Sequence, residues 1–480
     1  MNRQEINAKL RASYPMKHRW HNRFHLEMPF GLLNDPNGLS FYQGEYHIFY
    51  QWNPLGCEHK NKCWAHVHTR DFVNYSIPEL ALWPTDAYDQ DGCYSGCAFK
   101  EGDALRVIYT GNVRNPEGER ISSQRLGTLL EDGMVRKDDL LLAGPPEGYT
   151  AHFRDPYFFR RQGRQYLLLG AQTVDERGCV LLYVRAEDGR WQFCGEVRTQ
   201  LGRFGYMWEC PNLLQFGSHD VLVFCPQGVT AQEFAYQNRY EAGYVAGHLA
   251  TEKPEMLHGP FEELDHGFDF YAPQVFRHEG RNVLLGWMGM PDEEAFYPTA
   301  EAGWLYTLTM PRVLTFRSGH IYAAPAPELE ALRIVDSVVE LEEHAVSGLA
   351  VPLGDGAEIL LDIELGAASR LTFELVYGLE SVRLVYDRRR QLMQIDRMGM
   401  QLGARGVRTF HLAARDSFAL HLFVDKTAVE AFFQHGEQTA SFLVFPEKNI
   451  LPELTLHTDK AFTELTGSVW NLDGFAYTME

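Results

Sequence analysis

Five similar apolar segments recur along the first two thirds of the chain at nearly constant spacing. They are GEYHIFYQ (44–51), DALRVIYTG (103–111), GRQYLLLGA (163–171), SHDVLVFCPQ (218–227) and GRNVLLGWMG (280–289). Measured between His47, Arg106, Tyr166, Val221 and Val283, the steps are 59, 60, 55 and 62 residues. Short apolar runs that follow polar or Gly-containing turns are typical of buried strands. A repeat of this length accommodates a four-stranded sheet with loops and predicts a five-bladed β-propeller, the alternative being unrelated strands of a large β protein.

The residues after about 318 have a different pattern. The Ala- and Pro-rich stretch 323–333 predicts a linker that enters a short helix. Beyond it, short runs such as ILLDIEL (359–365), RLTFELVY (370–377) and LHLFVD (420–425) are typical of a β-sandwich. We therefore expect an all-β protein with an N-terminal extension (1–20), a propeller (21–322), a linker (323–335) and a sandwich (336–480).

A short acidic motif precedes three of the five apolar segments by eleven or twelve residues. The motifs are Asn34-Asp35-Pro36-Asn37-Gly38, Arg154-Asp155-Pro156 and Trp208-Glu209-Cys210-Pro211. Equivalent positions in successive blades of a propeller surround one axis, so we expect the three carboxyl groups to meet in a central pocket. A turn, a surface salt bridge and a buried, paired glutamate would each explain one motif alone. All three motifs precede a repeated segment by nearly the same number of residues, which favours a shared functional site.

Two carboxyl groups that face one pocket are the minimum equipment for hydrolysis of a glycosidic bond. Asp35 lies in a turn-forming stretch rich in hydrogen-bond donors, which suits an ionised nucleophile. Glu209 follows Trp208, and apolar neighbours would keep it protonated as the general acid. Arg154 is expected to hold Asp155 ionised, and the two together would suit vicinal sugar hydroxyls.

The charge balance restricts the partners of this chain. It has 44 basic and 64 acidic residues, a net charge of −20. This argues against nucleic acid, and it makes recognition of an anionic substrate depend on a local basic group. No run of apolar residues is long enough to span a membrane, and the N-terminus lacks the pattern of a secretory signal, so a cytoplasmic protein is expected. The eight cysteines are then expected to be reduced, and neither they nor His66 and His68 predict a metal site.

The three acidic motifs resemble the signature motifs of glycoside hydrolase family 32, which includes invertases, fructanases and sucrose-6-phosphate hydrolases. The matching segments are LLNDPNG (32–38), FRDPYFF (153–159) and WECPNLL (208–214). Further matches, among them YQWNPLG (50–56), LDHGFDFYAPQ (264–274) and FVDKTAVEAFFQHGE (423–437), extend the resemblance from about residue 20 to 475. The resemblance implies a five-bladed propeller joined to a sandwich, and a retaining β-fructofuranosidase without cofactor or metal.

Carried over by motif, the resemblance implies that Asp35 is the nucleophile and Glu209 the general acid/base. It implies that Asp155, with Arg154, holds fructosyl hydroxyls and stabilises the transition state. The residues that match positions lining the fructosyl pocket are Asn34, Gln51, Tyr94, Ser95, Arg154, Cys210, Tyr271 and Trp287. A retaining mechanism requires the carboxyl groups of Asp35 and Glu209 to lie about 5–5.5 Å apart.

This chain departs from the family pattern on the side of the leaving group. Leu32-Leu33 stand where many relatives have Trp-Met, and the loop 57–62 contains the basic residues His59, Lys60 and Lys62. The amino-acid sequence around this loop looks most like that of intracellular sucrose-6-phosphate hydrolases. We expect some of the three to contact a glucosyl 6-phosphate, the alternative being a solvated loop.

Three functions remain open from the sequence. The first is hydrolysis of sucrose 6-phosphate or sucrose through a covalent fructosyl-aspartate. The second is exo-hydrolysis of short fructo-oligosaccharides, which the lack of a secretory signal disfavours for polymeric fructans. The third is an inactive carbohydrate-binding protein, which the retention of all three carboxylates disfavours. A small sugar is the expected partner, and the sandwich is expected to pack on the propeller or to form a homodimer.

Overall fold

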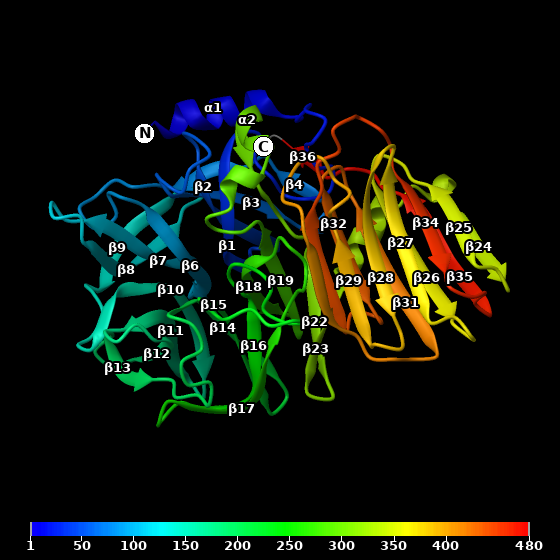
Figure 1. Ribbon diagram of the computed structural model, residues 1–480. Helices are drawn as coiled ribbons and strands as arrows, with labels where there is room; N and C mark the ends of the chain where they lie inside the picture. Colours follow the sequence, from blue (N-terminus) through cyan, green and yellow to red (C-terminus); the bar gives the residue numbers. More distant parts are fainter. Residues whose placement is uncertain (1, 479–480) are drawn as a thin grey trace.

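Each of the five predicted apolar segments forms the second strand of a separate sheet. The computed structural model describes residues 2–478, and these form mainly β-strands (Figure 1). The second strands are β2 (Glu45–Asn53), β7 (Ala104–Arg114), β11 (Arg164–Thr173), β15 (His219–Gln227) and β19 (Arg281–Met288). The repeat in the sequence therefore corresponds to a repeat of sheets.

The remaining strands of these sheets follow in chain order. The first sheet adds β1 (Gly31–Tyr42), β3 (Cys63–Thr69), β4 (Asn74–Ser76) and β5 (Glu79–Leu82). The second adds β6 (Cys93–Glu101), β8 (Arg120–Leu129) and β9 (Val135–Leu142), and the third adds β10 (Tyr149–Arg161), β12 (Gly178–Arg185) and β13 (Trp191–Glu196). The fourth adds β14 (Met207–Phe216), β16 (Gly243–Ala250) and β17 (Glu255–Glu263). The fifth adds β18 (Tyr271–His278), β21 (Thr307–Leu308), β22 (Arg312–Arg317) and β23 (His320–Pro325).

The first strands of the five sheets contact one another in a closed ring. Contacts link β1 to β6, β6 to β10, β10 to β14, β14 to β18 and β18 back to β1. Figure 1 shows these strands toward the middle of the left-hand body, with β9, β13 and β17 at its rim. Residues near the start of each first strand are thereby brought to a common centre.

Two short strands from later in the chain complete the first sheet. β20 (Trp304–Leu305) pairs in parallel with β1, and β36 (Ala476–Thr478) pairs in parallel with β4. The expected division placed residues 476–478 in the C-terminal unit and ended the N-terminal unit at 322. Instead, β36 belongs to the first sheet and β23 of the fifth sheet extends to Pro325. Backbone pairing, which residue spacing does not specify, accounts for both differences.

The C-terminal part consists of two six-stranded sheets that share one apolar core. One contains β24 (Val339–His344), β26 (Ala357–Glu364), β31 (Ser417–Val424), β32 (Ala428–Phe433), β33 (Gln438–Leu443) and β35 (Glu464–Asn471). The other contains β25 (Gly348–Pro352), β27 (Arg370–Tyr377), β28 (Glu380–Asp387), β29 (Leu392–Asp396), β30 (Val407–His411) and β34 (Glu453–Thr458). Every second residue of β27 is buried, because alternate side chains of a strand point to opposite faces. Leu371 and Phe373 thus meet Ile359 and Leu422 of the other sheet in the core.

The helical segments are short and lie between or beside the sheets. They are α1 (Arg3–Ser13), η1 (Glu294–Phe296), α2 (Thr299–Ala302), η2 (Pro327–Leu332) and η3 (Val335–Ser337). The side chain of Asn2 accepts a hydrogen bond from the backbone N–H of Gln4 and caps α1. Asn7 and Arg3 bind the backbone of Leu80 in β5, so α1 is fixed to the first sheet.

The two parts of the molecule meet at a buried group of charged side chains. Arg312 of β22 donates to Glu430 of β32 and, at 2.9 Å, to Asp265. His25 lies between Asp425 and Glu430, at 2.9 and 3.1 Å. These contacts join residues far apart in the sequence and fix how the C-terminal sheets sit on the ring.

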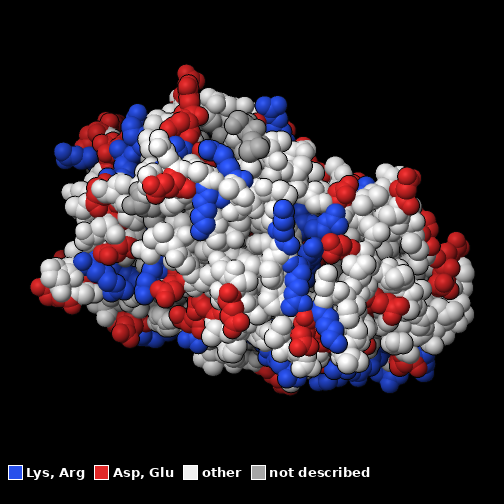
Figure 2. Space-filling model, turned by 90° about the horizontal axis from the view of Figure 1, so that it is seen from above, with Lys and Arg blue, Asp and Glu red and all other residues white. Residues whose placement is uncertain are grey.

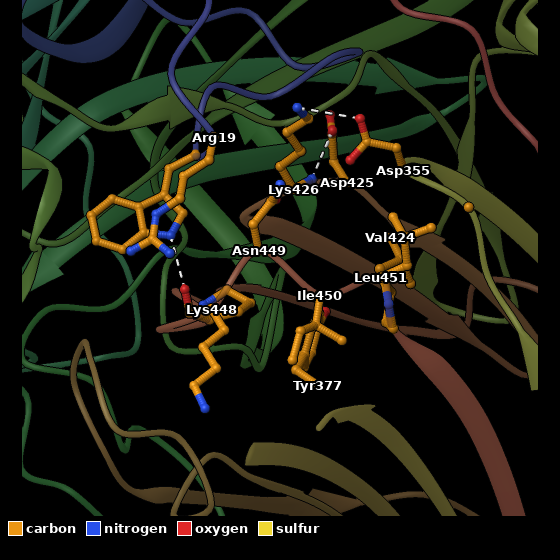
Figure 3. Close-up of a pocket in the computed structure, with 14 residues that line it drawn as sticks. Arg19, Asp355, Tyr377, Val424, Asp425, Lys426, Lys448, Asn449, Ile450 and Leu451 are labelled. Carbon is orange, nitrogen blue, oxygen red and sulfur yellow. Dashed lines mark hydrogen bonds and ion pairs between the residues drawn. The ribbon is translucent and has the colours of Figure 1, made fainter. Parts of the chain in front are cut away.

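A small pocket lies at the junction of the N-terminal segment and the C-terminal sheets (Figure 3). Arg19, Trp20 and Lys426 are among the residues that line it, and Lys426 forms an ion pair of 3.2 Å with Asp355. None of the three predicted carboxylates lines it. The surface in Figure 2 carries short groups of Lys and Arg between Asp and Glu, so the acid excess does not cover this face with one sign.

Candidate active site

The first strand of every sheet in the ring carries the same irregularity. Pairing with the second strand shifts between Leu33 and Pro36, Tyr94 and Gly96, Arg154 and Tyr157, Glu209 and Asn212, and Tyr271 and Gln274. Such β-bulges bend a strand and redirect its side chains. In four of the sheets the last paired residue before the bulge begins the triplets Tyr94-Ser95-Gly96, Arg154-Asp155-Pro156, Glu209-Cys210-Pro211 and Tyr271-Ala272-Pro273, whereas in the first sheet Asn34 and Asp35 both follow the last paired residue, Leu33.

This alignment corrects the predicted phase of the motifs. The sequence spacing treated Glu209 as the equivalent of Asp35 and Asp155. At the bulges, Cys210 is the equivalent of Asp155, and Glu209 aligns one position earlier with Arg154. Asp155 and Cys210 both have positive φ angles, 62° and 49°, in the left-handed region that is uncommon for residues other than glycine. The backbone is thus bent where the side chains enter the centre of the ring.

The three predicted carboxylates do share one site. The Sγ atom of Cys210 lies 3.9 Å from Oδ2 of Asp35 and 3.7 Å from Oδ2 of Asp155. Arg154 lies 4.0 Å from the carboxylate of Asp155 and binds that of Glu209 directly. A narrow cavity along the ring axis is lined by Asp155, Cys210 and the proline residues of the bulges.

Asp35 lies among hydrogen-bond donors, as its sequence context predicts. Asn34 Nδ2 donates to Oδ1 at 2.9 Å, and the hydroxyl of Ser95 donates to Oδ2. Gln51 accepts from Asn34 and donates to Ser95, both at 2.7 Å, and so orients the two donors. Asp35 itself remains partly exposed. A carboxylate held in this way is suited to attack a carbon atom in the pocket.

Glu209 has polar rather than apolar contacts, contrary to expectation. Arg154 donates twice to Oε1, at 2.9 and 2.6 Å. Gln227 and Tyr271 donate to Oε2 at 2.7 and 2.6 Å. Adjacent residues of a strand point to opposite faces, and Trp208 therefore stacks on a core phenylalanine instead of contacting the Glu209 carboxylate. Proximity along the chain was the wrong guide to the environment of this group.

Asp155 also differs from expectation. Burial raises the pKa of its carboxyl group to about 7; Arg154 opposes this shift, whereas Glu209 and Asp35 add to it. The backbone N–H of Cys210 donates to Oδ2 at 3.0 Å and favours the ionised form. The predicted effect of Arg154 is present, but desolvation exceeds it.

The predicted aromatic residues surround this group. Tyr271 contacts Glu209, and its ring lies 6.2 Å from that of Trp287. The indole N–H of Trp287 is buried without a hydrogen-bond partner in the part of the chain that the structure describes. The guanidinium of Arg120 lies over the ring of Tyr94. An unused donor and flat apolar surfaces at a polar pocket are features that suit a sugar.

The basic loop residues have partners of their own. Lys62 is buried and donates to Oδ1 of Asn34, and its Nζ lies 2.7 Å from Nδ1 of His59. Burial lowers the pKa of Lys62 to about 7. His59 lies 2.8 Å from Glu294, and the exposed Lys60 lies 2.9 Å from Glu58. Lys62 therefore belongs to the network around Asp35, whereas contact of any of the three with a phosphate stays a prediction.

Two contacts of the site were not predicted. Gln227, which binds Glu209, is the last residue of β15 and thus of a predicted apolar segment. His152 accepts from Arg154 at 2.9 Å. The position of Gln227 at the end of a second strand, on the same side as the bulges, is the signal that could have indicated it.

Neither a metal-binding cluster nor a membrane-spanning helix is found among the described residues. No group of three or more His, Cys, Asp or Glu within residues 2–478 is arranged to hold a metal ion. His47 and His66 stack and bind each other through their ring nitrogens at 3.0 Å. All eight cysteines are free thiols. Over the same residues, the helices are too short and polar to cross a membrane.

The ring of bulged strands with its three carboxylates is that of a glycoside hydrolase. The chain belongs to glycosyl hydrolases family 32: the N-terminal domain of that family matches residues 25–325, and its C-terminal domain matches residues 328–471. A sucrose-6-phosphate hydrolase of Bacillus subtilis (strain 168) is 37% identical over 98% of this chain and 97% of its own. One from Salmonella typhimurium is 40% identical over 91% of this chain and 89% of its own.

Solved structures agree with this assignment. The structure of sucrose-6-phosphate hydrolase from Lactobacillus gasseri superposes with a TM-score of 0.88 and 29% identity, over 98% of this chain and 97% of that one. A GH32 beta-fructofuranosidase from Bombyx mori gives a TM-score of 0.85 and 27% identity, over 99% and 98% of the two chains. Both parts of the molecule are thus shared with these proteins.

Proposed function

We propose that this protein is a retaining β-fructofuranosidase that hydrolyses the fructosyl bond of sucrose 6-phosphate and of sucrose. The observation that carries the proposal is the shared site of Asp35, Asp155 and Glu209 at the bulges of three first strands. Curated relatives that match nearly the whole chain bear the name sucrose-6-phosphate hydrolase, which supports the choice of substrate.

The fold belongs to the same proposal. We infer that the ring of five sheets is a five-bladed propeller and that the two six-stranded sheets form a β-sandwich, with a linker that begins after Pro325 between them. The cyclic contacts of the first strands and the shared core of the six-stranded sheets support this description. The free state of all eight cysteines supports a reducing compartment such as the cytoplasm.

The reaction follows from the two ends of the site. Asp35 attacks the anomeric carbon of the fructosyl unit while Glu209 gives a proton to the departing oxygen, which leaves a fructosyl ester on Asp35. Glu209 then takes a proton from water, which attacks the ester and releases fructose with net retention. The hydrogen bonds from Asn34 and Ser95 keep Asp35 in one orientation through both steps. The mechanism requires carboxyl groups about 5–5.5 Å apart.

Asp155 binds rather than reacts in this scheme. Its carboxyl group lies close enough to the other two for their charges to act on it, and it accepts a hydrogen bond from the backbone of Cys210. A carboxyl group and the neighbouring guanidinium of Arg154 together suit vicinal hydroxyls of the fructosyl ring. Interactions with these hydroxyls strengthen as the ring flattens toward the transition state.

Release of fructose from sucrose, sucrose 6-phosphate, kestose and inulin tests the proposal. Asp35→Asn and Glu209→Gln are each expected to lower kcat by at least about 10³-fold, because each removes a group that acts in the transition state. Asp188→Asn, at an exposed surface position, is the matched control and is expected to keep the wild-type rate.

Each alternative function has its own outcome in this assay. Faster release from kestose and inulin than from either sucrose compound would instead support an exo-hydrolase of fructo-oligosaccharides. A folded wild-type protein that releases fructose from none of the four would contradict an enzymatic role and support a carbohydrate-binding protein.

A further inference from the structure

One basic residue outside the loop 57–62 lies beside a predicted pocket residue, Tyr94. β8 begins at Arg120, which pairs with Arg114 at the end of β7. The same end of β7 pairs, through Gly111 and Cys93, with the start of β6. Arg120 therefore lies where Tyr94 enters the pocket, and its Cζ atom is 5.7 Å from the centre of the Tyr94 ring.

Arg120 has no ion-pair partner within residues 2–478. Within residues 2–478 its guanidinium makes neither a hydrogen bond nor an ion pair, and its contact is with the face of Tyr94. Burial lowers the pKa of Arg120, and the nearby positive charge of Arg154 lowers it further. The group still carries its charge at any physiological pH. Charged groups removed from water are ordinarily paired, so Arg120 is prepared for an anion that the protein itself does not supply.

A neutral donor lies beside this charge. Arg154 Nη1 donates to Nδ1 of His152, and because a guanidinium can only donate, the ring hydrogen of His152 must be on Nε2. Burial, followed by the charges of Arg154 and Arg120, lowers the pKa of His152 to about 4, so the ring is neutral near pH 7. Its Nε2–H has no hydrogen-bond partner within residues 2–478.

Both groups border the side of the pocket from which the leaving group departs. The general acid must reach the oxygen that joins the fructosyl unit to the leaving group. Arg154 binds Glu209 on one side and His152 on the other. The charge of Glu209 also acts on Arg120. The group of Arg120 and His152 is thus next to the acid that defines the leaving-group side.

We propose that Arg120, with His152 beside it, binds the 6-phosphoryl group of the leaving glucosyl unit. The inference rests on the proposed function, and it names the residues that select the phosphorylated substrate. A guanidinium presents two parallel N–H donors that match two phosphoryl oxygens, and the imidazole supplies a third donor. This local pair of donors also provides the attraction that a chain of net charge −20 does not provide as a whole.

The loop 57–62 is a weaker place for a phosphoryl group. Lys62 is bound to Asn34. His59 already faces the carboxylate of Glu294, and Lys60 faces that of Glu58. A phosphoryl group there would have to displace one of those carboxylates or be repelled by it. At Arg120 it would replace nothing.

The test is the ratio of kcat/KM for sucrose 6-phosphate to kcat/KM for sucrose. Arg120→Gln is expected to lower this ratio by roughly 10- to 100-fold, the effect of losing hydrogen bonds to a charged group. Arg120→Lys is expected to lower it less, because it keeps the charge but loses the paired donors. Arg136→Gln on β9 removes an exposed charge from the same sheet and is expected to keep the wild-type ratio.

Inhibition of sucrose hydrolysis gives an independent readout. Glucose 6-phosphate is expected to inhibit the wild type more strongly than glucose or inorganic phosphate alone, and Arg120→Gln is expected to lose this preference. Thermal unfolding measures whether both Arg120 variants are folded. If Arg120→Gln does not fold, the test uses Arg120→Lys in its place.

The possible failures can be told apart. A wild type active on both substrates, with an unaltered ratio in both Arg120 variants, would overturn this inference alone. A ratio that falls in Lys60→Gln but not in Arg120→Gln would also overturn it and place the phosphoryl group at the loop 57–62. A wild type that releases fructose from neither substrate would overturn the proposed function and with it this inference.

Discussion

Asp155 illustrates how strongly position outweighs sequence neighbours for a single side chain. It is buried beside two other carboxyl groups, and its nearest guanidinium, that of Arg154, makes its closest contacts with Glu209. The pKa of Asp155 is consequently raised to about 7. Between about pH 4 and 7 the folded protein therefore keeps a proton that the unfolded chain loses, and this group makes the protein less stable as the pH rises.

Asp155→Asn removes this dependence because the amide cannot ionise. The melting temperature of the variant is expected to fall less than that of the wild type between about pH 5 and pH 8, while kcat falls by orders of magnitude. Thermal unfolding at both pH values measures the difference, and Asp188→Asn is the surface control. Parallel melting curves for the wild type and Asp155→Asn would contradict the raised pKa.

The sequence was informative for side chains whose partners are local. The donors around Asp35 include Asn34, its direct neighbour, and the prediction of a donor-rich environment is confirmed. It was uninformative for Glu209, whose partners come from β10, β15 and β18. No pattern within the motif Trp208-Glu209-Cys210-Pro211 indicates which side chains of other strands will face Glu209.

At the scale of the element, the bulge is the device that repeats. Each of the five first strands has a proline or a glycine at its bulge. Proline has no backbone N–H and glycine has no side chain, and the residues are Pro36, Gly96, Pro156, Pro211 and Pro273. Proline is tolerated in strands mainly at edges and bulges, since it cannot donate to the ladder. The strands themselves were predictable from their apolar runs. The bulges were not, because they depend on pairing with the second strand.

Gly96 is the position where this device has least room. A Cβ atom there would lie 1.9 Å from the carbonyl oxygen of Ile108 and 2.7 Å from Cα of Tyr109, both in the backbone of β7. Gly96→Ala is expected to lower the free energy of unfolding by about 1–3 kcal/mol or more. Denaturant unfolding measures the change, with Gly144→Ala, where a Cβ meets nothing within 4 Å, as the control. Equal stability of the two variants would show that β6 can move away from β7 without loss.

At the scale of the whole molecule, buried charges hold the C-terminal sheets to the ring. Arg312 is almost fully buried and binds both Asp265 and Glu430, and Glu430 also faces His25. The apolar core within each part follows from alternating patterns in the sequence. This charged interface does not, because its contacts join residues that lie 47, 118 and 405 positions apart in the sequence.

Arg312→Met is expected to destabilise the protein strongly. The substitution leaves the carboxylates of Asp265 and Glu430 without their shared cation, and the loss of one partner of a buried ion pair costs about 3–5 kcal/mol. Denaturant unfolding measures the loss, and Arg190→Met removes a highly exposed arginine as the control. A change below about 1 kcal/mol would contradict the role of Arg312 as the cation that Asp265 and Glu430 share.

The strand β36 ties the last part of the chain to the first sheet, which also contains Asp35. The N-terminal residues of a chain leave the ribosome first. The outer edge of the sheet that begins at Gly31 can therefore be paired only after residues 476–478 have been synthesised. During synthesis that edge stays open while the other four sheets already have all their strands. The nascent protein thus matures in an order different from that of its sequence, and its proposed nucleophile belongs to the sheet that is finished last.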